Sequence, residues 1–339
     1  MEQQQRREIS DNHFGDNNTI HQGDVHNHWS KDQEDEKAQC LSDLRITDPR
    51  HDKLRIESTK GGLLEDSYSW IFEHGDFQQW HDNKDRPLLW IKGDPGKGKT
   101  MLLCGIIDKL RNQSSPKTLI TYFFCQAGDS RINSATAVLR GLTYLAIDEQ
   151  PQLISLIQSK YRHGKKTIFE DTNAWTALSG ILSAMLNDTS LEQSFVIIDA
   201  LDECATDLRN LLDFINTKST LFPQWVVSSH NWPEIEESLN SSANQQTRLC
   251  LELNDKSITM AVDIYIKHQV ERLKHKRKFS EEIQHTLLHE LSAKSNNTFL
   301  WVFLVCQNLE KTPSLDILET LSKFPRLDLI RYTEGCSSK

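Results

Sequence analysis

The sequence lacks the features of membrane-spanning and secreted proteins. In its 339 residues the longest apolar run, Phe299–Cys306, is less than half of the ~20 residues that a membrane helix needs. The first ten residues, MEQQQRREIS, are polar and contain no apolar core, so no secretory signal is recognised. Glycine and proline are sparse, at 14 and 9 residues, which excludes collagen-like and Pro/Gly-rich chains. These absences predict a cytoplasmic protein with no membrane span.

Paired cysteines and an excess of positive charge are also missing. The seven cysteines are scattered without a C-x-x-C pair, mostly in apolar runs, so we expect reduced thiols rather than disulfides or a metal cluster. The net charge of −9 offers no general attraction to nucleic acid or anionic lipid. One basic cluster, Lys274–Lys278, follows an apolar stripe and is interpreted as the solvated end of a helix. We therefore predict no nucleic-acid partner.

What the sequence does contain is an alternation of short apolar runs with helical periods. The runs have the length of strands and are bounded by polar or turn residues: 87–92, 119–125, 195–199, 225–229 and 249–253. Helical periods, such as that of residues 134–163, lie between them, and only helical periods follow residue 253. Strands separated by helices predict a parallel sheet covered on both faces. The predicted fold class is therefore α/β, with flanking helices and a small all-α domain after the sheet.

The strongest chemical signal is a full G-x-x-x-x-G-K-[ST] pattern. It consists of Gly93, Asp94, Pro95, Gly96, Lys97, Gly98, Lys99 and Thr100. The pattern follows a predicted strand and opens a predicted helix, which is the setting of a P-loop. Backbone N–H groups of such a loop point at phosphate oxygens, and the helix N-terminus adds positive charge. Lys99 would contact the β- and γ-phosphates and the Thr100 hydroxyl would bind Mg²⁺, so a nucleotide site of a P-loop NTPase is predicted.

A P-loop also needs a carboxylate for the metal, expected at the end of a neighbouring buried strand. Asp199 ends an apolar run at the carboxyl edge, where ligands bind in open α/β sheets, and we expect it to hold Mg²⁺ through water. Asp202 and Glu203 follow, and either would orient or deprotonate an attacking water or, alternatively, cap the helix predicted over 205–217. His230 ends the next strand and either contacts the γ-phosphate or makes only a loop contact.

At this point the chain resembles a known family. Six segments together resemble fungal NACHT proteins of the STAND class of signal-transduction NTPases, which are related to vegetative-incompatibility proteins and NOD-like receptors: 59–80, 88–103, 122–142, 195–204, 226–236 and 296–311. The small residue after Asp199, followed by paired acids, is distinctive of NACHT. The resemblance implies an ATP- or GTP-dependent oligomerisation switch in self/non-self recognition or programmed cell death. It also implies that Gly93–Thr100 is the Walker A motif, Asp199 the Walker B metal ligand, and Asp202 and Glu203 the extended acids.

The resemblance covers about residues 40–325, and together with the polar composition of residues 1–39 it predicts domain limits. These are a disordered tail at 1–39, a helical linker at 40–85, the NACHT P-loop NTPase domain at 86–254, a helical domain at 255–325 and a tail at 326–339. Relatives commonly carry arginine at the position of His230. Histidine is shorter and mostly neutral at pH 7, so His230 differs from the residue that the family uses to contact the γ-phosphate. The family continues into a winged-helix region and sensor repeats. None is recognised here, so we expect a chain truncated before them.

The N-terminal tail contains an unusual stretch at residues 13–29. Its Gly-Asp pairs at 15–16 and 23–24, with Asn, Thr and Ile between them and Val after the second pair, suit stacking with copies of the same segment. The stretch also resembles the amyloid signalling motifs of some fungal relatives, which template a matching motif in a partner. The alternatives are a plain disordered tail and a metal site formed by the three histidines His21, His26 and His28.

The sequence is consistent with two functions. The first is a nucleotide-operated signalling switch, at most a weak NTPase, with slow Mg-dependent hydrolysis of ATP or GTP. The second is a truncated interaction protein that binds nucleotide without significant turnover and joins full-length relatives as a partner or decoy. Homo-oligomers or full-length relatives are the expected protein partners. The choice between ATP and GTP depends on pocket walls, including the 55–70 segment, that residue spacing does not define.

Overall fold

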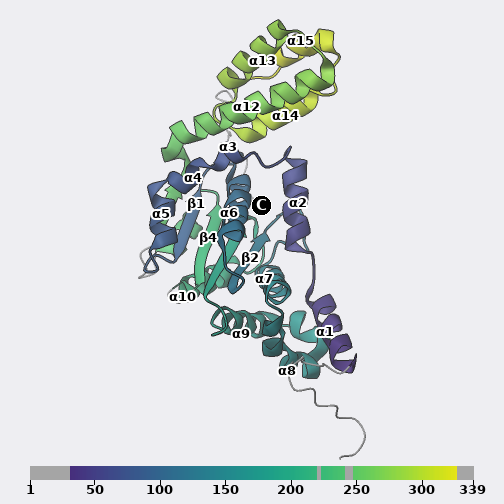
Figure 1. The fold of residues 1–339 in the computed structure, drawn as a ribbon, viewed down its shortest axis with the longest axis vertical. Coiled ribbons are helices and arrows are strands. Elements are labelled where there is room, and N and C mark those ends of the chain that lie inside the picture. The colour runs from purple at the N-terminus through teal and green to yellow at the C-terminus, as the bar shows by residue number, and fades with distance from the viewer. Residues whose placement is uncertain (1–30, 220–222, 241–246, 327–339) are drawn as a thin grey trace, which may run out of the picture.

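The computed structural model describes residues 31–219, 223–240 and 247–326. At its centre lies a five-stranded sheet in the order β2-β3-β4-β1-β5, with every pairing parallel (Figure 1). The strands are β1 (Leu88–Lys92), β2 (Thr118–Phe124), β3 (Gln193–Asp199), β4 (Pro223–Ser229) and β5 (Thr247–Cys250). The predicted parallel sheet is therefore confirmed. However, β4 lies between β1 and β3, so the strand that ends at Asp199 is not the direct neighbour of the strand before the P-loop.

Helices cover both faces of the sheet, as predicted. The helices between β1 and β5 in the sequence are α6 (Lys99–Gln113), α7 (Ala135–Glu149), α8 (Ser155–Gly164), α9 (Ala174–Leu186), α10 (Leu208–Lys218) and α11 (Pro233–Asn240). Successive residues of β1 point to opposite faces: Trp90 belongs to the apolar cluster with α7, α9 and α10, whereas Leu89 and Ile91 belong to the cluster with α6. A strand buried on both faces explains why this run is almost continuously apolar.

The helical period of residues 134–163 forms two helices rather than one. Helix α7 ends at Glu149, a 3₁₀ turn spans Pro151–Ile154, and α8 begins at Ser155. Proline disfavours helical geometry at the residue before it and has no N–H to donate, so the break falls at Pro151.

Within residues 31–87, five helices precede the sheet. They are α1 (Lys31–Leu44), α2 (Pro49–Thr59), α3 (Glu65–Tyr68), α4 (Trp70–Glu73) and α5 (Gly75–Asp82). Helix α1 includes residues 31–39, which we predicted to be part of the disordered tail. Its Glu36 accepts hydrogen bonds from Arg162 (2.9 Å) and Lys165 (3.0 Å), contacts that lie far away in the sequence and that no local pattern could reveal. The 13–29 stretch and its histidines lie outside the described residues.

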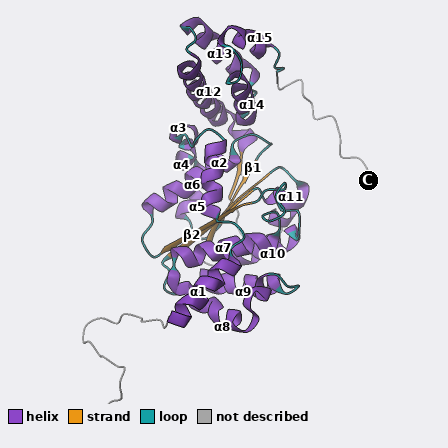
Figure 2. Ribbon diagram, turned by 90° about the vertical axis from the view of Figure 1, so that its right-hand side faces the viewer, coloured by secondary structure: helices purple, strands orange, loops and turns teal. Residues whose placement is uncertain are grey.

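The helices after β5 form a lid at the carboxyl edge of the sheet (Figures 1 and 2). They are α12 (Asp255–Arg277), α13 (Glu281–Lys294), α14 (Phe299–Leu309) and α15 (Ile317–Ser322), together called the helical lid below. The lid shares one apolar cluster with the α6 face of the sheet, since Val262 and Val302 pack in the same cluster as Leu103. The basic cluster lies in the last turn of α12, as predicted. None of the helices described is both long and apolar enough to span a membrane.

Candidate nucleotide site

The P-loop forms the turn between β1 and α6. Gly96 and Gly98 have φ angles of +78° and +89°, a conformation that glycine adopts without the steric cost of a side chain. Helix α6 begins at Lys99, and Thr100 lies in its first turn. The loop therefore has the curled backbone and the helix N-terminus that the sequence predicted, and both favour a bound anion.

Lys99 lies inside the loop, at 8% exposure. Its Nζ donates to the carbonyl oxygens of Gly93 (2.6 Å) and Asp94 (3.0 Å). Burial lowers the pKa of Lys99, and the negative charges of Asp202 and Asp199 act in the opposite direction. The ammonium group therefore lies within the electrostatic reach of the acids that follow β3, as a phosphate and metal site requires.

Asp199 ends β3 at the same edge of the sheet and is 3% exposed. Its Oδ1 accepts a hydrogen bond from Ser228 Oγ at 2.6 Å, and Ser228 Oγ in turn accepts the Ala200 N–H at 2.9 Å. Ala200 has φ +56°, so a small residue suits this left-handed turn better than a branched one. This explains the small residue after Asp199. Ser228, which fixes the carboxylate, was not assigned this role from the sequence.

Asp202 and His230 form a pair across β3 and β4. Asp202 Oδ1 accepts the backbone N–H of His230 at 2.8 Å, and Oδ2 lies 2.9 Å from His230 Nδ1. The Asp202 side chain is 3% exposed, whereas that of His230 is 30% exposed. Burial acts to raise the pKa of Asp202, but the hydrogen bonds from His230 outweigh it and hold the pKa below its ordinary value. Both oxygens of Asp202 are thus bound by one neighbour.

Glu203 faces a different loop. Its Oε2 accepts the N–H of Ala127, after β2, at 3.0 Å. Asp202 and Glu203 both lie in the short 3₁₀ turn Leu201–Glu203, and neither caps the following helix, which begins at Leu208 after Asp207. The helix-cap alternative for these acids therefore does not describe this structure.

A carboxylate that the sequence analysis did not single out holds the outer side of the P-loop. Glu252, just after β5, accepts the Asp94 N–H at 2.5 Å, and Asn231 Nδ2 donates to Asp94 Oδ1 at 3.3 Å. Burial acts to raise the pKa of Glu252, but the hydrogen bonds from the Asp94 N–H, Cys250 and Asn231 together outweigh it, so the pKa is lowered. The loops after β1, β4 and β5 are thereby joined. The sequence feature that could have indicated this contact is the presence of a glutamate inside the otherwise apolar run 249–253.

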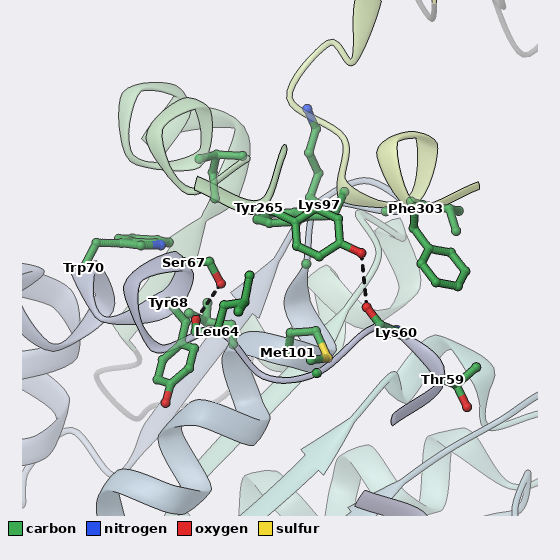
Figure 3. A pocket seen from close by; sticks show the side chains of 17 residues that line it. Thr59, Lys60, Leu64, Ser67, Tyr68, Trp70, Lys97, Met101, Tyr265 and Phe303 are labelled. Carbon is green, nitrogen blue, oxygen red and sulfur yellow. Dashed lines mark hydrogen bonds between the residues drawn. The ribbon is translucent and has the colours of Figure 1, made fainter. Parts of the chain in front are cut away.

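A cavity of about 270 Å³ lies beside the P-loop, between it and the helical lid (Figure 3). Its walls come from three parts of the chain and are mostly apolar, with Leu64, Met101, Ile258, Tyr265, Phe299 and Phe303 among them. Tyr265 Oη donates to the carbonyl oxygen of Lys60 at 3.1 Å and so closes the wall between α12 and the loop after α2. An apolar cavity next to a phosphate-binding loop has the character of a site for a flat heterocycle.

Comparison with known proteins places this site in a family. The family model described as Nephrocystin 3, N-terminal, matches residues 66–230. The vegetative incompatibility protein HET-E-1 of Podospora anserina is 53% identical over 291 residues, which is 85% of this chain. This chain is a NACHT-type P-loop NTPase homologous to HET-E-1. It spans 21% of the length of HET-E-1. The fold of a NACHT P-loop NTPase implies nucleotide binding.

Two solved structures are similar at a lower level. PCH-2 of C. elegans is 14% identical, with a TM-score of 0.35 over 88% of this NACHT chain and 67% of its own. The Drosophila ORC bound to GC-rich DNA and Cdc6 is 10% identical, with a TM-score of 0.35 over 97% of this chain and 53% of the ORC chain. Similarity of this degree carries no conclusion about function.

Proposed function

We propose that this chain binds a nucleoside triphosphate with Mg²⁺ and acts as a signalling switch in vegetative incompatibility. The observation that carries the proposal is the position of Lys99, buried in the P-loop within reach of the charges of Asp199 and Asp202. The phosphates bind the backbone N–H groups of Gly96–Thr100, because Pro95 has no N–H and the Asp94 N–H is already bound to Glu252. The heterocycle lies in the cavity lined by Tyr265 and Phe299. The homology to a vegetative incompatibility protein supports the biological role.

The residues present suit Mg²⁺. Thr100 offers a hydroxyl and Asp199 a carboxylate, both hard oxygen ligands, and Mg²⁺ keeps several waters, so two protein groups suffice. Ser228 fixes Asp199 Oδ1 at 2.6 Å, which orients the carboxylate as supporting residues do in metal sites. When bound, the metal would neutralise charge on the β- and γ-phosphates. The same two residues thus belong to the proposed magnesium site.

We assign the activation of water to Glu203 rather than to Asp202. Asp202 is held by His230 at both oxygens, so it is a poor acceptor for a further proton. Glu203 has one oxygen on the Ala127 N–H, and the other is left to orient water. In this proposal His230 positions Asp202 and has no direct role in sensing the γ-phosphate. Slow hydrolysis is the expected consequence, since a single partly engaged carboxylate serves as the base.

The alternative, binding without significant turnover as an interaction partner, is favoured by one observation: both acids after Asp199 make structural hydrogen bonds. Measured turnover separates the two. Labelled ATP and GTP are titrated into the purified chain with and without Mg²⁺, and single-turnover hydrolysis is then followed. We expect binding and a rate well below the order of 1 s⁻¹. Binding with no cleavage supports the alternative, steady turnover above that rate contradicts both, and no binding of either nucleotide contradicts the proposal itself.

Two partner assignments complete the proposal. Nucleotide exchange would control assembly with further copies of the chain or with full-length relatives. Residues 13–29 would template a matching motif in a partner by stacking of β-branched and Asn residues. A peptide covering residues 10–30 tests the second assignment, because thioflavin-positive fibres are expected and a peptide that stays monomeric at high concentration rules it out.

A further inference from the structure

The P-loop contains a second lysine, and its side chain leaves the loop toward the helical lid. Figure 3 shows the Lys97 side chain pointing away from the loop. Lys97 Nζ donates to the carbonyl oxygens of Asn296 (3.1 Å) and Asn297 (3.2 Å). These asparagines connect α13 to α14, and their φ angles are +45° and +56°. Two successive left-handed residues turn the chain sharply between the helices, and the Lys97 ammonium group bridges the two neighbouring carbonyl groups. Lys97 is separated from these two asparagines by 199 and 200 residues of sequence.

The backbone of the same loop is in close contact with the start of α14. A Cβ atom added at Gly96 would lie 2.8 Å from both Thr298 Cγ2 and Leu300 Cβ, and one at Gly98 would lie 2.9 Å from the Phe299 ring. Leu300 N–H also donates to the Gly96 carbonyl oxygen at 3.4 Å. These glycines therefore serve a second purpose besides their φ angles, because a larger residue would push the lid away from the phosphate-binding loop.

The turn that receives Lys97 is itself fastened to the lid. Asn297 Nδ2 donates to Asp255 Oδ1 at 2.7 Å, at the first residue of α12. Helix α12 in turn contacts the loop after α2 through Tyr265. The Lys97 contact is thus connected, through Asn297 and Asp255, to the first residue of α12, where the chain passes from the sheet into the lid.

We propose that Lys97 is a positioning residue that holds the helical lid against the P-loop and thereby slows nucleotide release. This rests on the proposed function, since the cavity assigned to the heterocycle has Lys97 and Gly98 on one wall and Phe299 and Phe303 on the other. A ligand enclosed there leaves when these walls separate, and separation breaks the two Lys97 hydrogen bonds. Lys99 binds the phosphates and Lys97 holds the lid, so the two lysines of one motif have different tasks.

Stopped-flow release of a fluorescent nucleoside diphosphate tests the assignment. Lys97→Met keeps the length of the side chain and removes the donors, and we expect release to be about tenfold faster with the association rate nearly unchanged, the size expected for lost charged hydrogen bonds. Lys97→Arg keeps the donors and should restore slow release. The control Lys267→Met changes an exposed lysine on α12 and should match the original protein.

Hydrogen–deuterium exchange of the nucleotide-free protein provides a readout that does not need the ligand. Amides of residues 298–302 should exchange faster in Lys97→Met than in the original protein, and Lys97→Arg should restore their protection. Unchanged exchange and unchanged release in Lys97→Met overturn the assignment, as does an arginine variant that behaves like methionine. If the original protein binds no nucleotide, the proposed function fails, yet the exchange experiment still decides whether Lys97 holds the lid.

Discussion

The P-loop after β1 and the acidic turn after β3 lie at the same edge of the sheet, but they are held in different ways. The lysines of the P-loop donate to backbone carbonyl oxygens, those of Gly93 and Asp94 for Lys99 and those of the lid for Lys97. In the acidic turn, Asp202 is held by His230 and is almost entirely buried. A phosphate oxygen is a stronger acceptor for an ammonium group than a carbonyl, so the Lys99 contacts can be exchanged for phosphate, whereas the buried pair is costly to break.

This difference separates binding from hydrolysis. The loop that receives the phosphates can give up its internal hydrogen bonds for better ones, and the turn that carries the acids is set before any ligand arrives. Variants in the first region should therefore change affinity and release, and variants in the second should change turnover or stability.

The largest effect is expected at Lys99. Lys99→Ala removes the buried ammonium group and leaves the apolar strands unchanged, so nucleotide affinity should fall by about a hundredfold or more. Calorimetric titration of the folded variant measures this. Lys109→Ala, on the exposed side of the same helix, is the control and should bind normally. Equal affinity of the Lys99 variant and the original protein would show that the P-loop does not bind phosphate through this lysine.

The next effect tests the acidic turn. Glu203→Gln keeps an oxygen for the Ala127 N–H but cannot take a proton from water, so single-turnover hydrolysis should slow by about a hundredfold while affinity changes little. Rapid-quench assays at saturating nucleotide give the rate. If hydrolysis is unaffected, Glu203 only fastens the loop after β2, and the two regions do not divide binding from hydrolysis.

The Asp202–His230 pair should be visible in the pH dependence of stability. The pKa of Asp202 is below its ordinary value of 3.8 in the folded protein, so its contribution is present above that pH and is lost as the pH falls toward the lower, folded pKa. His230→Ala removes the side-chain hydrogen bond and raises the pKa of Asp202. Urea unfolding between pH 3 and 6 should show a smaller acid-induced loss in this variant, and an identical loss would contradict the assigned cause.

Asp202→Asn sharpens the same comparison at neutral pH. Replacing a buried carboxylate that accepts two hydrogen bonds from His230 should lower the free energy of unfolding by about 1–3 kcal/mol. Nucleotide affinity should stay close to that of the original protein, because Asp202 is not among the residues that we assign to phosphate binding. A large loss of affinity with unchanged stability would place Asp202 in the binding site itself.

The smallest effect concerns the cavity. Tyr265→Phe keeps the ring and removes the hydroxyl that donates to the Lys60 carbonyl oxygen. A single neutral hydrogen bond contributes about 1 kcal/mol, so the affinity should fall by about fivefold and the release rate should rise accordingly. Titration with ATP and with GTP measures the affinity for each nucleotide, and stopped-flow release measures the rate. A loss for one base alone would show that the wall after α2 distinguishes the two.

Local patterns in the sequence were sufficient for several elements. Alternating apolar runs and helical periods predicted a parallel sheet, because burial on both faces is encoded in consecutive residues. The spacing of Gly93, Gly96 and Gly98 before Lys99 predicted the P-loop, since the backbone conformation of such a loop is a local property. The same reasoning placed the end of the apolar run at 253, although β5 ends at Cys250 and a 3₁₀ turn follows. The helical period of residues 134–163 contains two helices, because Pro151 interrupts the helical backbone between α7 and α8.

The buried segments, the tight turns and the phosphate-binding motif could all be predicted from the sequence, because these depend on neighbours within a few residues. The partners of the polar side chains, in contrast, follow from the packing of the whole fold: Asp202 with His230, Glu252 with the Asp94 N–H, and Lys97 with the lid. The first two contacts join residues that the strand order brings together, and the third joins the P-loop to the lid that packs on it. That geometry depends on how the whole sheet and lid pack, which no local pattern contains.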